Sequence, residues 1–254
     1  MLAQERRNLI LERLHEEKRV VVAELSQQFN VSEETIRRDL ERLEKDGYAT
    51  KSYGGAVINE NVSIDMPFNV RKKRNISGKK RIAELVDSMV ENGDHIILDA
   101  STTAVFIAKA LKHKKNLTVI TNSLEIMIEL SDTTGWTVLS PGGRLREGDL
   151  ALVGPRMVEG LQAYHVEKAF ISCKGADIDG GFTDGNEDLA HTKRVMLGCA
   201  KEKVLVVDSS KLDTVAFAHI GAMTDVDTVV TDCEPSSKWL EFFSHVGIQC
   251  LYPR

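Results

Sequence analysis

The sequence has few cysteines, no long run of apolar residues and no cluster of metal-ligating side chains. Its four cysteines lie far apart and include no Cys-x-x-Cys pair, which excludes a disulfide framework and is typical of reduced cytosolic thiols. The seven histidines are scattered without helical pair spacing, so we expect neither a metal nor a cofactor. No apolar stretch approaches the ~18–20 residues of a membrane helix, and the charged N-terminus lacks the apolar core of a signal peptide. We therefore expect a cytoplasmic protein without a membrane partner.

Charge is distributed unevenly along the 254 residues, whose net charge is -5. Residues 1–81 contain 17 basic and 13 acidic side chains, whereas the remainder contains 16 and 25. Such an asymmetry favours an N-terminal part that meets a polyanion. Most of the excess lies in the run from Arg71 to Arg81, for which a solvated helix face and a direct DNA contact remain equal alternatives.

The first sixty residues predict a helix-turn-helix. Apolar residues at helical spacing predict helices over Leu2–Glu17 and Ala23–Phe29, and a third helix from Glu33 to about Asp46. Ser32 stands where an N-cap belongs, and Gly47 ends the third helix. Two helices joined by so short a turn are typical of DNA-binding proteins of this class.

The third helix carries the side chains expected to contact DNA. Its exposed face has two stripes at three-and-four spacing, one with Thr35, Arg38 and Arg42 and the other with Glu34, Arg37 and Glu41. Neighbouring residues diverge by about 100° around a helix, so Arg37 and Arg38 point in different directions. One of them can pair with a guanine edge in the major groove while the other grips phosphate.

A small hairpin follows this helix. Tyr48–Ser52 and Ala56–Ile58 are strand-like, and Tyr53-Gly54-Gly55 forms the turn between them. A Gly-Gly tip lets the backbone approach a phosphate closely. Three helices and this hairpin together predict a winged helix-turn-helix.

The stretch from Val31 to Glu44, with Gly47 and Tyr53-Gly54-Gly55-Ala56, resembles the N-terminal domain of DeoR-family bacterial transcription regulators. The family usually has arginine at the position of Lys51 and histidine at that of Tyr53. Lys51 keeps a positive charge but lacks the bidentate fork of arginine. The DNA-binding residues expected from the pattern and the resemblance are Ser32, Glu34, Thr35, Arg37, Arg38, Arg42, Lys51, Tyr53, Gly54 and Gly55.

The polar segment from Asn59 to Asn69 shows no sustained period and contains Pro67, which indicates a domain boundary. We predict a DNA-binding domain over residues 1–58, a linker over 59–76 and a larger domain over 77–254. In the larger domain a helix over Ser77–Val90 is followed by short apolar runs that alternate with amphipathic stretches. This alternation predicts an α/β domain with a mostly parallel sheet and helices on both faces.

Polar residues follow the predicted strands, and ligands of open α/β sheets bind beyond the carboxyl ends of strands. Ser101, Thr102 and Thr103 precede a helix, where hydroxyls and free N–H groups can hold a phosphate. Arg144, Lys193 and Lys211 can balance the remaining charge, and Asp99, Asp177 or Glu187 can accept from sugar hydroxyls. Each feature also has an ordinary explanation as a cap, a turn or a solvated lysine. Together they predict a small, polar, phosphorylated ligand.

The region from about Ile82 to Val230 also resembles the DeoR-family sensor domain, which is similar in fold to ribose-5-phosphate isomerase and CoA-transferase-like proteins and typically senses sugar phosphates. Ser101 or Ala100 stands where the family usually has glycine, and the segment from Gly175 to Thr183 is shorter than in the family. The effector-binding residues expected here are Asp99, Ser101, Thr102, Thr103, Asn122, Gly142, Gly143, Arg144, Gly175, Asp177, Glu187, Lys193 and Lys211.

We therefore expect a sequence-specific transcriptional regulator, a repressor of a carbohydrate-metabolism operon that is modulated by a phosphorylated sugar. Its partners would be operator DNA, this effector and further copies of the chain in a dimer or tetramer. The alternative is a sugar-phosphate isomerase-like enzyme with a DNA-binding appendage. Where such isomerases place their base glutamate, this chain has Asp184-Gly185-Asn186-Glu187 and then Lys193, and a cation there argues against catalysis.

Overall fold

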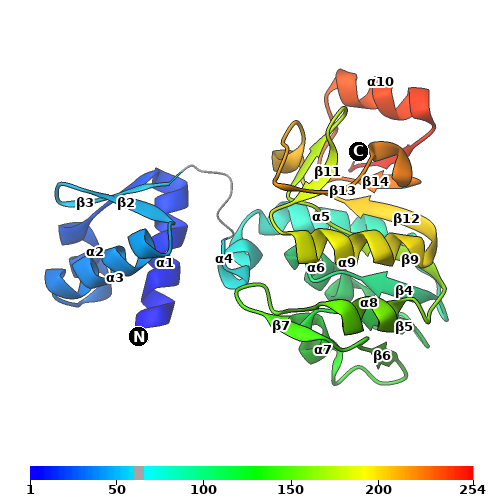
Figure 1. Ribbon diagram of the computed structural model, residues 1–254, viewed down its shortest axis with the longest axis horizontal. Coiled ribbons are helices and arrows are strands. Elements are labelled where there is room, and N and C mark those ends of the chain that lie inside the picture. The colour runs from blue at the N-terminus through cyan, green and yellow to red at the C-terminus, as the bar shows by residue number, and fades with distance from the viewer. Residues whose placement is uncertain (60–65, 254) are drawn as a thin grey trace. The chain divides into compact units, whose positions relative to one another are not determined.

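The computed structural model describes residues 1–59 and 66–253, which form two compact units. The N-terminal unit is Met1–Arg74 and the C-terminal unit is Asn75–Arg254, drawn in Figure 1. The division falls inside the range predicted as the linker, of which residues 60–65 lie outside the described part. The same range contains a short helix, α4 (Phe68–Lys73), that the sequence pattern did not indicate.

The N-terminal unit contains the predicted helices and hairpin, each within two residues of its expected bounds. Its further elements are α1 (Ala3–Glu17), β1 (Arg19–Val21), α2 (Val22–Phe29), α3 (Glu33–Lys45), β2 (Ala49–Ser52) and β3 (Gly55–Ile58). The three strands form an antiparallel sheet in the order β1-β3-β2. β1, which directly follows α1, is therefore the third strand of the wing sheet.

Local hydrogen bonds set the angle between α2 and α3. Asn30 ends α2 in the left-handed region with φ 51°, a conformation that asparagine tolerates. The Ser26 hydroxyl donates to the Val31 carbonyl at 2.7 Å, which closes the turn. The Ser32 hydroxyl then accepts from the Thr35 N–H at 3.2 Å, confirming the predicted N-cap of α3.

A buried ion pair joins α1 to α3. Arg6 Nε lies 2.5 Å from Asp39 Oδ2, and both side chains are at least nine-tenths buried. Arg7 Nη1 lies 3.6 Å from the other oxygen of Asp39. Because Asp39 belongs to the helix expected to enter DNA, this pair fixes that helix against α1.

The core of the C-terminal unit is a seven-stranded parallel sheet with the order β15-β14-β12-β9-β4-β5-β6. Its strands are β4 (His95–Leu98), β5 (Thr118–Thr121), β6 (Thr137–Leu139), β9 (Val166–Ile171), β12 (Ala200–Val206), β14 (Thr228–Val230) and β15 (Gln249–Leu251). β4, the first strand of this sheet along the chain, has β5 on one side and β9 on the other. The order of strands therefore reverses between β4 and β9, which makes this edge the topological switch point.

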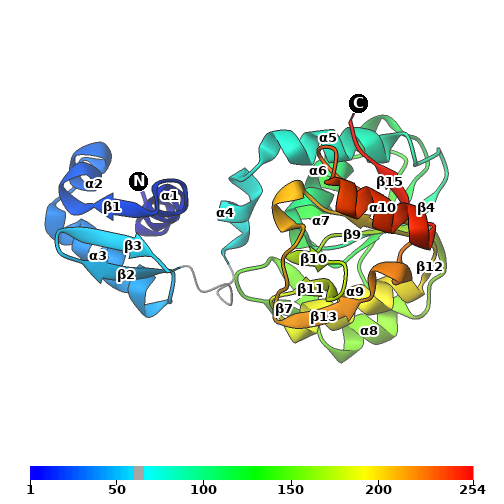
Figure 2. The ribbon, with the colours of Figure 1, turned by 90° about the horizontal axis from the view of Figure 1, so that it is seen from above.

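Helices cover both faces of this sheet, as the alternating pattern predicted. They are α5 (Ile76–Asp87), α6 (Thr102–Ala110), α7 (Leu124–Leu130), α8 (Pro155–Leu161), α9 (Glu187–Gly198) and α10 (Ser237–Val246). Figure 2 shows α5 and α6 on one side of the sheet and α8 and α9 on the other. Large apolar side chains of α8, α9 and α10, including Trp239 and Phe243, pack in one core cluster against the sheet.

Two small antiparallel structures stand beside the main sheet and were not predicted. One is the pair β7 (Arg144–Arg146) and β8 (Ala151–Val153), and the other is the sheet of β10 (Gly175–Asp177), β11 (Gly181–Asp184) and β13 (Ala218–Gly221). Strands of three or four residues are too short to show an alternating pattern.

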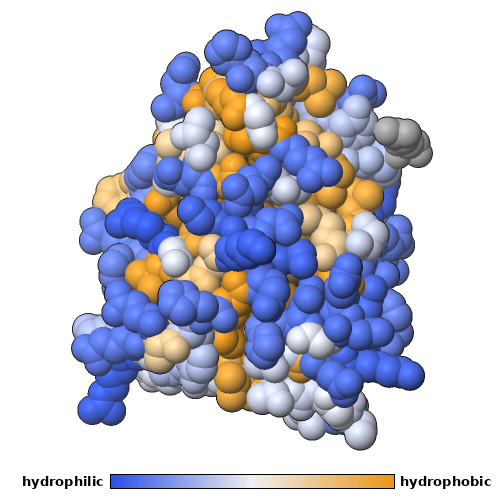
Figure 3. Space-filling model, turned by 90° about the vertical axis from the view of Figure 1, so that its right-hand side faces the viewer, coloured by the Kyte–Doolittle hydropathy of each residue, from blue (hydrophilic) through white to orange (hydrophobic). Residues whose placement is uncertain are grey.

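The surface of the C-terminal unit is mixed. On the face shown in Figure 3, hydrophilic residues surround patches of hydrophobic ones. None of the helices in the described part of the chain is both long and apolar enough to cross a bilayer.

The buried pair between α1 and α3 gives a stability prediction. We expect Asp39→Ala to lower the free energy of unfolding of the N-terminal unit by about 3–5 kcal/mol, because the buried Arg6 guanidinium loses its partner. Amide hydrogen exchange of α3 in the full chain measures this free energy. Glu24→Ala, which removes an exposed partner of Arg13, is the control and should cost less than about 1 kcal/mol. Equal exchange rates in the two variants would contradict the assigned role.

Candidate functional site

The exposed face of α3 carries three arginines, each paired with an acidic residue one turn away. Arg37 lies 2.5 Å from Glu33, Arg38 lies 3.3 Å from Glu34, and Arg42 lies 3.2 Å from Asp46. The Arg37 and Arg38 side chains remain 54% and 76% exposed. Exposed pairs of this kind contribute only about 0–1 kcal/mol. The guanidinium groups can therefore leave their carboxylates for a phosphate or a base edge at little cost.

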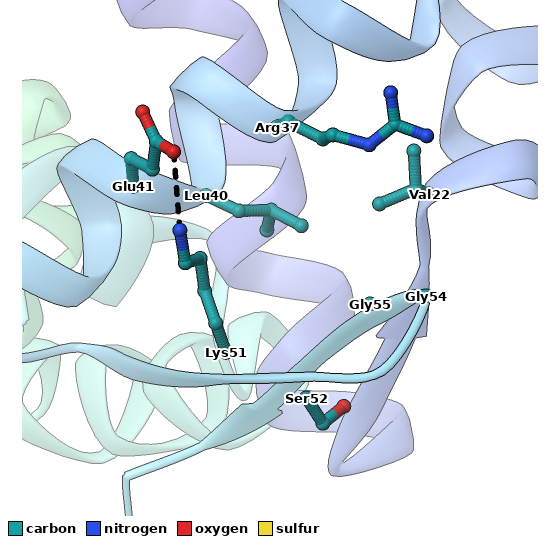
Figure 4. Close-up of a pocket in the computed structure, with 8 residues that line it drawn as sticks. All are labelled: Val22, Arg37, Leu40, Glu41, Lys51, Ser52, Gly54 and Gly55. Atoms are coloured by element: carbon teal, nitrogen blue, oxygen red, sulfur yellow. Dashed lines mark hydrogen bonds and ion pairs between the residues drawn. The ribbon is translucent and has the colours of Figure 1, made fainter.

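A shallow pocket separates α3 from the wing, and Figure 4 shows the residues around it. Arg37, Leu40 and Glu41 line it from α3, while Val22, Lys51, Ser52, Gly54 and Gly55 line it from the other side. Lys51 Nζ lies 3.1 Å from Glu41, and its backbone N–H donates to Glu44 at 2.8 Å. The lysine predicted to grip phosphate thus also ties the wing to the recognition helix.

The two glycines of the wing differ in their structural roles. Gly54 adopts φ +78° at the tip, beside a fully exposed Tyr53, and a Cβ there would meet nothing within 4 Å. A Cβ at Gly55 would lie 2.0 Å from the Val20 carbonyl oxygen. Gly55 is therefore required by the packing of β3 on β1, which the sequence pattern did not reveal, whereas the backbone at Gly54 is open.

The remaining predicted DNA contacts lie at the start of α3. The Ser32 and Thr35 hydroxyls lie 2.9 Å apart and are both exposed or half-exposed. Glu34 lies within 4.0 Å of Arg37 and 3.3 Å of Arg38. The predicted DNA-binding residues thus all belong to α3, its N-cap or the wing, and their contacts with DNA stay a prediction.

In the C-terminal unit, polar side chains gather at the switch point. Asp99 follows β4 and is almost fully buried. Its Oδ1 accepts from the Ser101 N–H at 3.0 Å and its Oδ2 from the Ser172 N–H at 2.9 Å. The Ser101 hydroxyl caps α6 through the Ala104 N–H at 3.0 Å. We predicted that Asp99 accepts from a sugar, but the structure uses both of its oxygens within the protein.

Lys193 of α9 lies beneath this loop and is buried. Its Nζ is 2.5 Å from Asp184 Oδ2, 2.8 Å from the Ser172 carbonyl oxygen and 3.4 Å from Asp99 Oδ2. Burial by itself would lower the pKa of Lys193, but the two carboxylates raise it above its ordinary value. The same ion pair lowers the pKa of Asp184 despite the burial of that carboxyl. Lys193 was expected to balance the charge of a ligand, whereas the structure balances it with Asp184 and Asp99.

Two further lysines lie closer to solvent. Lys211 Nζ is 3.4 Å from the Ser172 hydroxyl and 3.6 Å from Asp208 Oδ2. Burial lowers the pKa of Lys174 to about 8; Asp184 opposes this shift, while the positive charges of Lys193 and Lys211 add to it. Lys174 therefore belongs to the same group of charges. We name this group the switch-point cluster: Asp99, Ser172, Lys174, Asp184, Lys193, Asp208 and Lys211.

Sequence reasoning missed Ser172, Lys174 and Asp184 as members of this site. The signal was available, because Ser172-Cys173-Lys174 directly follows the apolar end of β9. We had instead selected Gly175 and Asp177, which the structure places in β10. Asp177 Oδ1 accepts from the Asp179 and Gly180 N–H groups and so closes its own turn. A Cβ at Gly175 would lie 2.3 Å from the Thr214 carbonyl oxygen, so this glycine is required for packing.

Two predicted residues near the switch point carry buried oxygen atoms that lack a hydrogen-bond partner in the described part of the chain. These atoms are Oγ1 of Thr103, at the start of α6, and Oδ1 of Asn122, directly after β5. Asn122 Nδ2 donates to the Leu152 carbonyl at 2.9 Å, which fixes its orientation. Thr102, next to Thr103, is likewise buried. An unpaired buried polar atom is costly, and a polar ligand is one way to satisfy it.

The other predicted effector residues have different surroundings. Arg144 is exposed and pairs with Asp188 at 3.0 Å, and Glu187 is exposed at the start of α9. Gly143 has φ +122°, and a Cβ there would lie 2.8 Å from the Val153 carbonyl oxygen, so it is needed for packing on β8. Gly142 adopts φ +84° with open space around it. These contacts do not join the four residues to the switch-point cluster.

The described residues contain no group of three or more His, Cys, Asp or Glu side chains arranged to hold a metal ion. The charged groups at the switch point instead mix ammonium and carboxylate groups within hydrogen-bond distance of a serine. Such an arrangement can bind a ligand that carries both negative charge and hydroxyl groups.

Both units match known families. Residues 74–233 match the DeoR C terminal sensor domain, and residues 6–62 match the DeoR-like helix-turn-helix domain. The uncharacterized HTH-type transcriptional regulator YulB of Bacillus subtilis (strain 168) is 44% identical over 232 residues, covering 91% of this chain and 90% of that protein. The HTH-type transcriptional repressor GlcR of the same organism is 32% identical and covers 99% of this chain and 96% of its own.

A further relative is the glycerol-3-phosphate regulon repressor of Escherichia coli (strain K12), 29% identical over 96% of this chain and 97% of that protein. Among solved structures, ribose 5-phosphate isomerase A from Methanocaldococcus jannaschii matches with a TM-score of 0.39, 18% identity and 53% coverage of each chain. The two domain matches and the full-length relatives give one answer: the chain belongs to the DeoR family of transcriptional regulators.

Proposed function

We propose that this DeoR-family regulator represses a carbohydrate-metabolism operon and leaves its operator when a phosphorylated sugar binds at the switch-point cluster. The observation that carries the proposal is the group of buried charges at the carboxyl ends of β4 and β9, in a unit without DNA-reading elements. A relative named for the glycerol-3-phosphate regulon supports the class of ligand. The protein is not an enzyme in this proposal.

DNA binding rests on α3 and the wing. Arg37 lines the pocket beside the wing, whereas Arg38 is more exposed and points about 100° away from Arg37 around the helix axis. One arginine therefore reads a base edge in the major groove while the other contacts phosphate. The N-terminus of α3, with Ser32 and Thr35, is favourable for a second phosphate. Tyr53 and Gly54 at the wing tip approach the neighbouring backbone.

Operator recognition requires more than one copy of the chain. A single recognition helix reads too few base pairs for specificity on the scale of a genome. The C-terminal unit exposes large apolar side chains, among them Ile128, Val215 and Phe217, that water leaves poorly solvated. We propose that surfaces of this unit join the copies in a homo-oligomer.

In this proposal Lys174 and Lys211 bind the negatively charged group of the ligand. Lys193 is already neutralised by two carboxylates, whereas Lys174 and Lys211 are both only partly buried. The start of α6, with Ser101 to Thr103, adds hydroxyls and a helix N-terminus from the neighbouring strand end. Asn122 and Asp208 are the polar residues at the two sides of the proposed site.

The contacts of the carboxylates argue against an isomerase. Such a reaction needs a base with a pKa near neutrality beside the sugar. Lys193 is bound to both Asp99 and Asp184, and the pKa of Asp184 is lowered. We therefore assign no catalytic residue. A steady rise of ribulose 5-phosphate when the protein is incubated with ribose 5-phosphate would overturn this part of the proposal.

The recognition helix can be tested by substitution. Arg37→Ala or Arg38→Ala should weaken operator binding by about 1–3 kcal/mol where the arginine contacts a base. Gel-shift titration with the operator measures the change. Arg13→Ala is the control, because Arg13 lies on α1 and pairs with Glu17 and Glu24. Unchanged affinity in both recognition-helix variants would refute the assignment.

The effector site can be tested separately from DNA binding. Lys211→Ala should leave operator affinity intact and remove the release caused by a sugar phosphate, because the ammonium group that contacts the ligand is lost. Gel shifts in the presence of glycerol 3-phosphate, fructose 1-phosphate or glucose 6-phosphate measure release. Lys238→Ala, which changes an exposed lysine of the same unit, should respond like the unaltered protein. Full release of the Lys211 variant would show that the site lies elsewhere.

The lowered pKa of Lys174 predicts a pH dependence of anion binding. Lys174 is cationic below its pKa of about 8 and neutral above it, so affinity for an anion should fall as pH rises from 7 to 9. Sulfate is a suitable probe because its charge is constant in this range, and calorimetry measures its affinity. Lys174→Met should bind sulfate more weakly at pH 7 and lose the decline, whereas Lys201→Met, at an exposed position, should keep it. Identical profiles in the two variants would exclude Lys174 from the site.

A further inference from the structure

One buried carboxylate outside the switch-point cluster contacts both the segment that carries two of the cluster's residues and the beginning of the C-terminal unit. Asp232 follows β14 and is only 4% exposed. Its Oδ1 accepts from the Ser209 N–H at 2.7 Å. Its Oδ2 accepts from the Asn75 side-chain amide at 3.1 Å and lies 3.7 Å from Arg81. The Asn75 and Ser209 segments are 134 residues apart in sequence, and both bond to this carboxylate.

Ser209 belongs to the segment that positions Lys211. A short 3₁₀ helix, Ser209–Lys211, directly follows Asp208, so two members of the switch-point cluster flank Ser209. Asp208 caps this turn by accepting from the Ser210 N–H at 3.2 Å. A displacement of Lys211 toward a ligand therefore acts on the Ser209 N–H and on its bond to Asp232.

Asn75 is the first residue of the C-terminal unit and directly follows Arg74, the last residue of the N-terminal unit. It adopts φ 42° and caps α5, with its side-chain oxygen accepting from the Gly78 N–H at 3.2 Å. Its Nδ2 atom is thereby left to donate to Asp232. A Cβ at Gly78 would lie 2.4 Å from both Asn75 Nδ2 and Asp232 Oδ2, so glycine is required where these groups meet.

The energetics favour a defined contact. Burial would raise the pKa of Asp232, but the hydrogen bonds from Ser209 and Asn75 lower it below its ordinary value. The carboxylate is therefore charged, and separating a buried charge from its hydrogen-bond partners costs much free energy. Loss of the hydrogen bond from Ser209 therefore changes the strength of the bond from Asn75, and the reverse also holds.

We propose that Asp232 is a positioning residue that couples the Lys211 segment to the junction between the two units. It transmits a displacement of Ser209 to Asn75, where the chain leaves for the DNA-binding unit. The regulatory meaning of this link rests on the proposed function. Coupling of this kind is reciprocal, so a change at Asn75 also alters the Lys211 segment.

Reciprocity allows a test without any ligand, by amide hydrogen exchange on the full chain. Ser209→Pro removes the donor to Asp232, and proline suits this position because Asp208 is extended and residue 209 begins the 3₁₀ helix. The Gly78 and Lys79 amides, which Asn75 caps, should then exchange roughly three- to tenfold faster. Asn75→Asp keeps the cap acceptor but sets a second carboxylate against Asp232. It should accelerate exchange at Ser210, Lys211 and Leu212 by a similar factor.

A rescue separates this link from general loosening of the structure. Combining Asn75→Asp with Asp232→Asn exchanges donor and acceptor, so the hydrogen bond can form in the opposite direction. The double variant should restore slow exchange at Ser210 to Leu212. Asp227→Asn is the matched control, since Asp227 precedes the other end of β14 and accepts the Lys203 N–H at 2.8 Å. It should leave exchange in both segments unchanged.

The proposal is overturned if each single variant accelerates exchange only in its own segment, or if the double variant exchanges as fast as Asn75→Asp alone. Operator gel shifts with the three sugar phosphates named above test the proposed function independently. If none of them releases the unaltered protein while the exchange responses are reciprocal, the proposed function fails and the Asp232 link stands.

Discussion

The buried charge of Lys193 is the constraint on which the C-terminal unit depends. An ammonium group in a protein core requires compensation, and this one receives it from Asp184 at the end of β11 and from Asp99 directly after β4. Asp99 in turn holds the backbone after β4 and after β9, so one charge sets both loops at the switch point. The result is a rigid base beneath two lysines that are closer to solvent. Rigidity at the base and exposure above it are what a ligand site requires.

In the N-terminal unit, too, buried charges hold the structure together while exposed charges are available for new contacts. Arg6 and Asp39 are buried and hold α3 in place, whereas Arg37, Arg38 and Arg42 pair loosely at the surface. Buried pairs resist change, while exposed pairs are weak and exchange partners readily. The position of the recognition helix is therefore fixed, and its contacts remain available. Charge counts could not predict this division, because a buried and an exposed arginine are the same residue type in the sequence.

Sequence patterns predicted the elements of the fold well where the elements are long. The helical spacing of apolar residues and the cap at Ser32 predicted α3 to within a residue, and the alternation of apolar runs with amphipathic stretches predicted the mostly parallel sheet of the larger domain. The pattern failed for α4, for β15 and for the strands of the two small antiparallel structures, whose three or four residues show no alternating period. At the switch-point cluster, sequence reasoning selected Asp99, Lys193 and Lys211 but took Asp177 in place of Lys174. Which polar residue faces a crevice depends on the turns that follow each strand, and those turns come from long-range packing such as that of Gly175 on Thr214.

The contacts of Lys51 have a consequence for the proposed reading of DNA. Its ion pair with Glu41 is exposed and weak, so the ammonium group can leave the carboxylate for a phosphate, as the arginines of α3 can. Its backbone N–H still donates to Glu44, which keeps the wing beside the recognition helix. If both elements contact the duplex as proposed, their spacing favours sites whose groove width fits it, so the local shape of the double helix would count together with its bases.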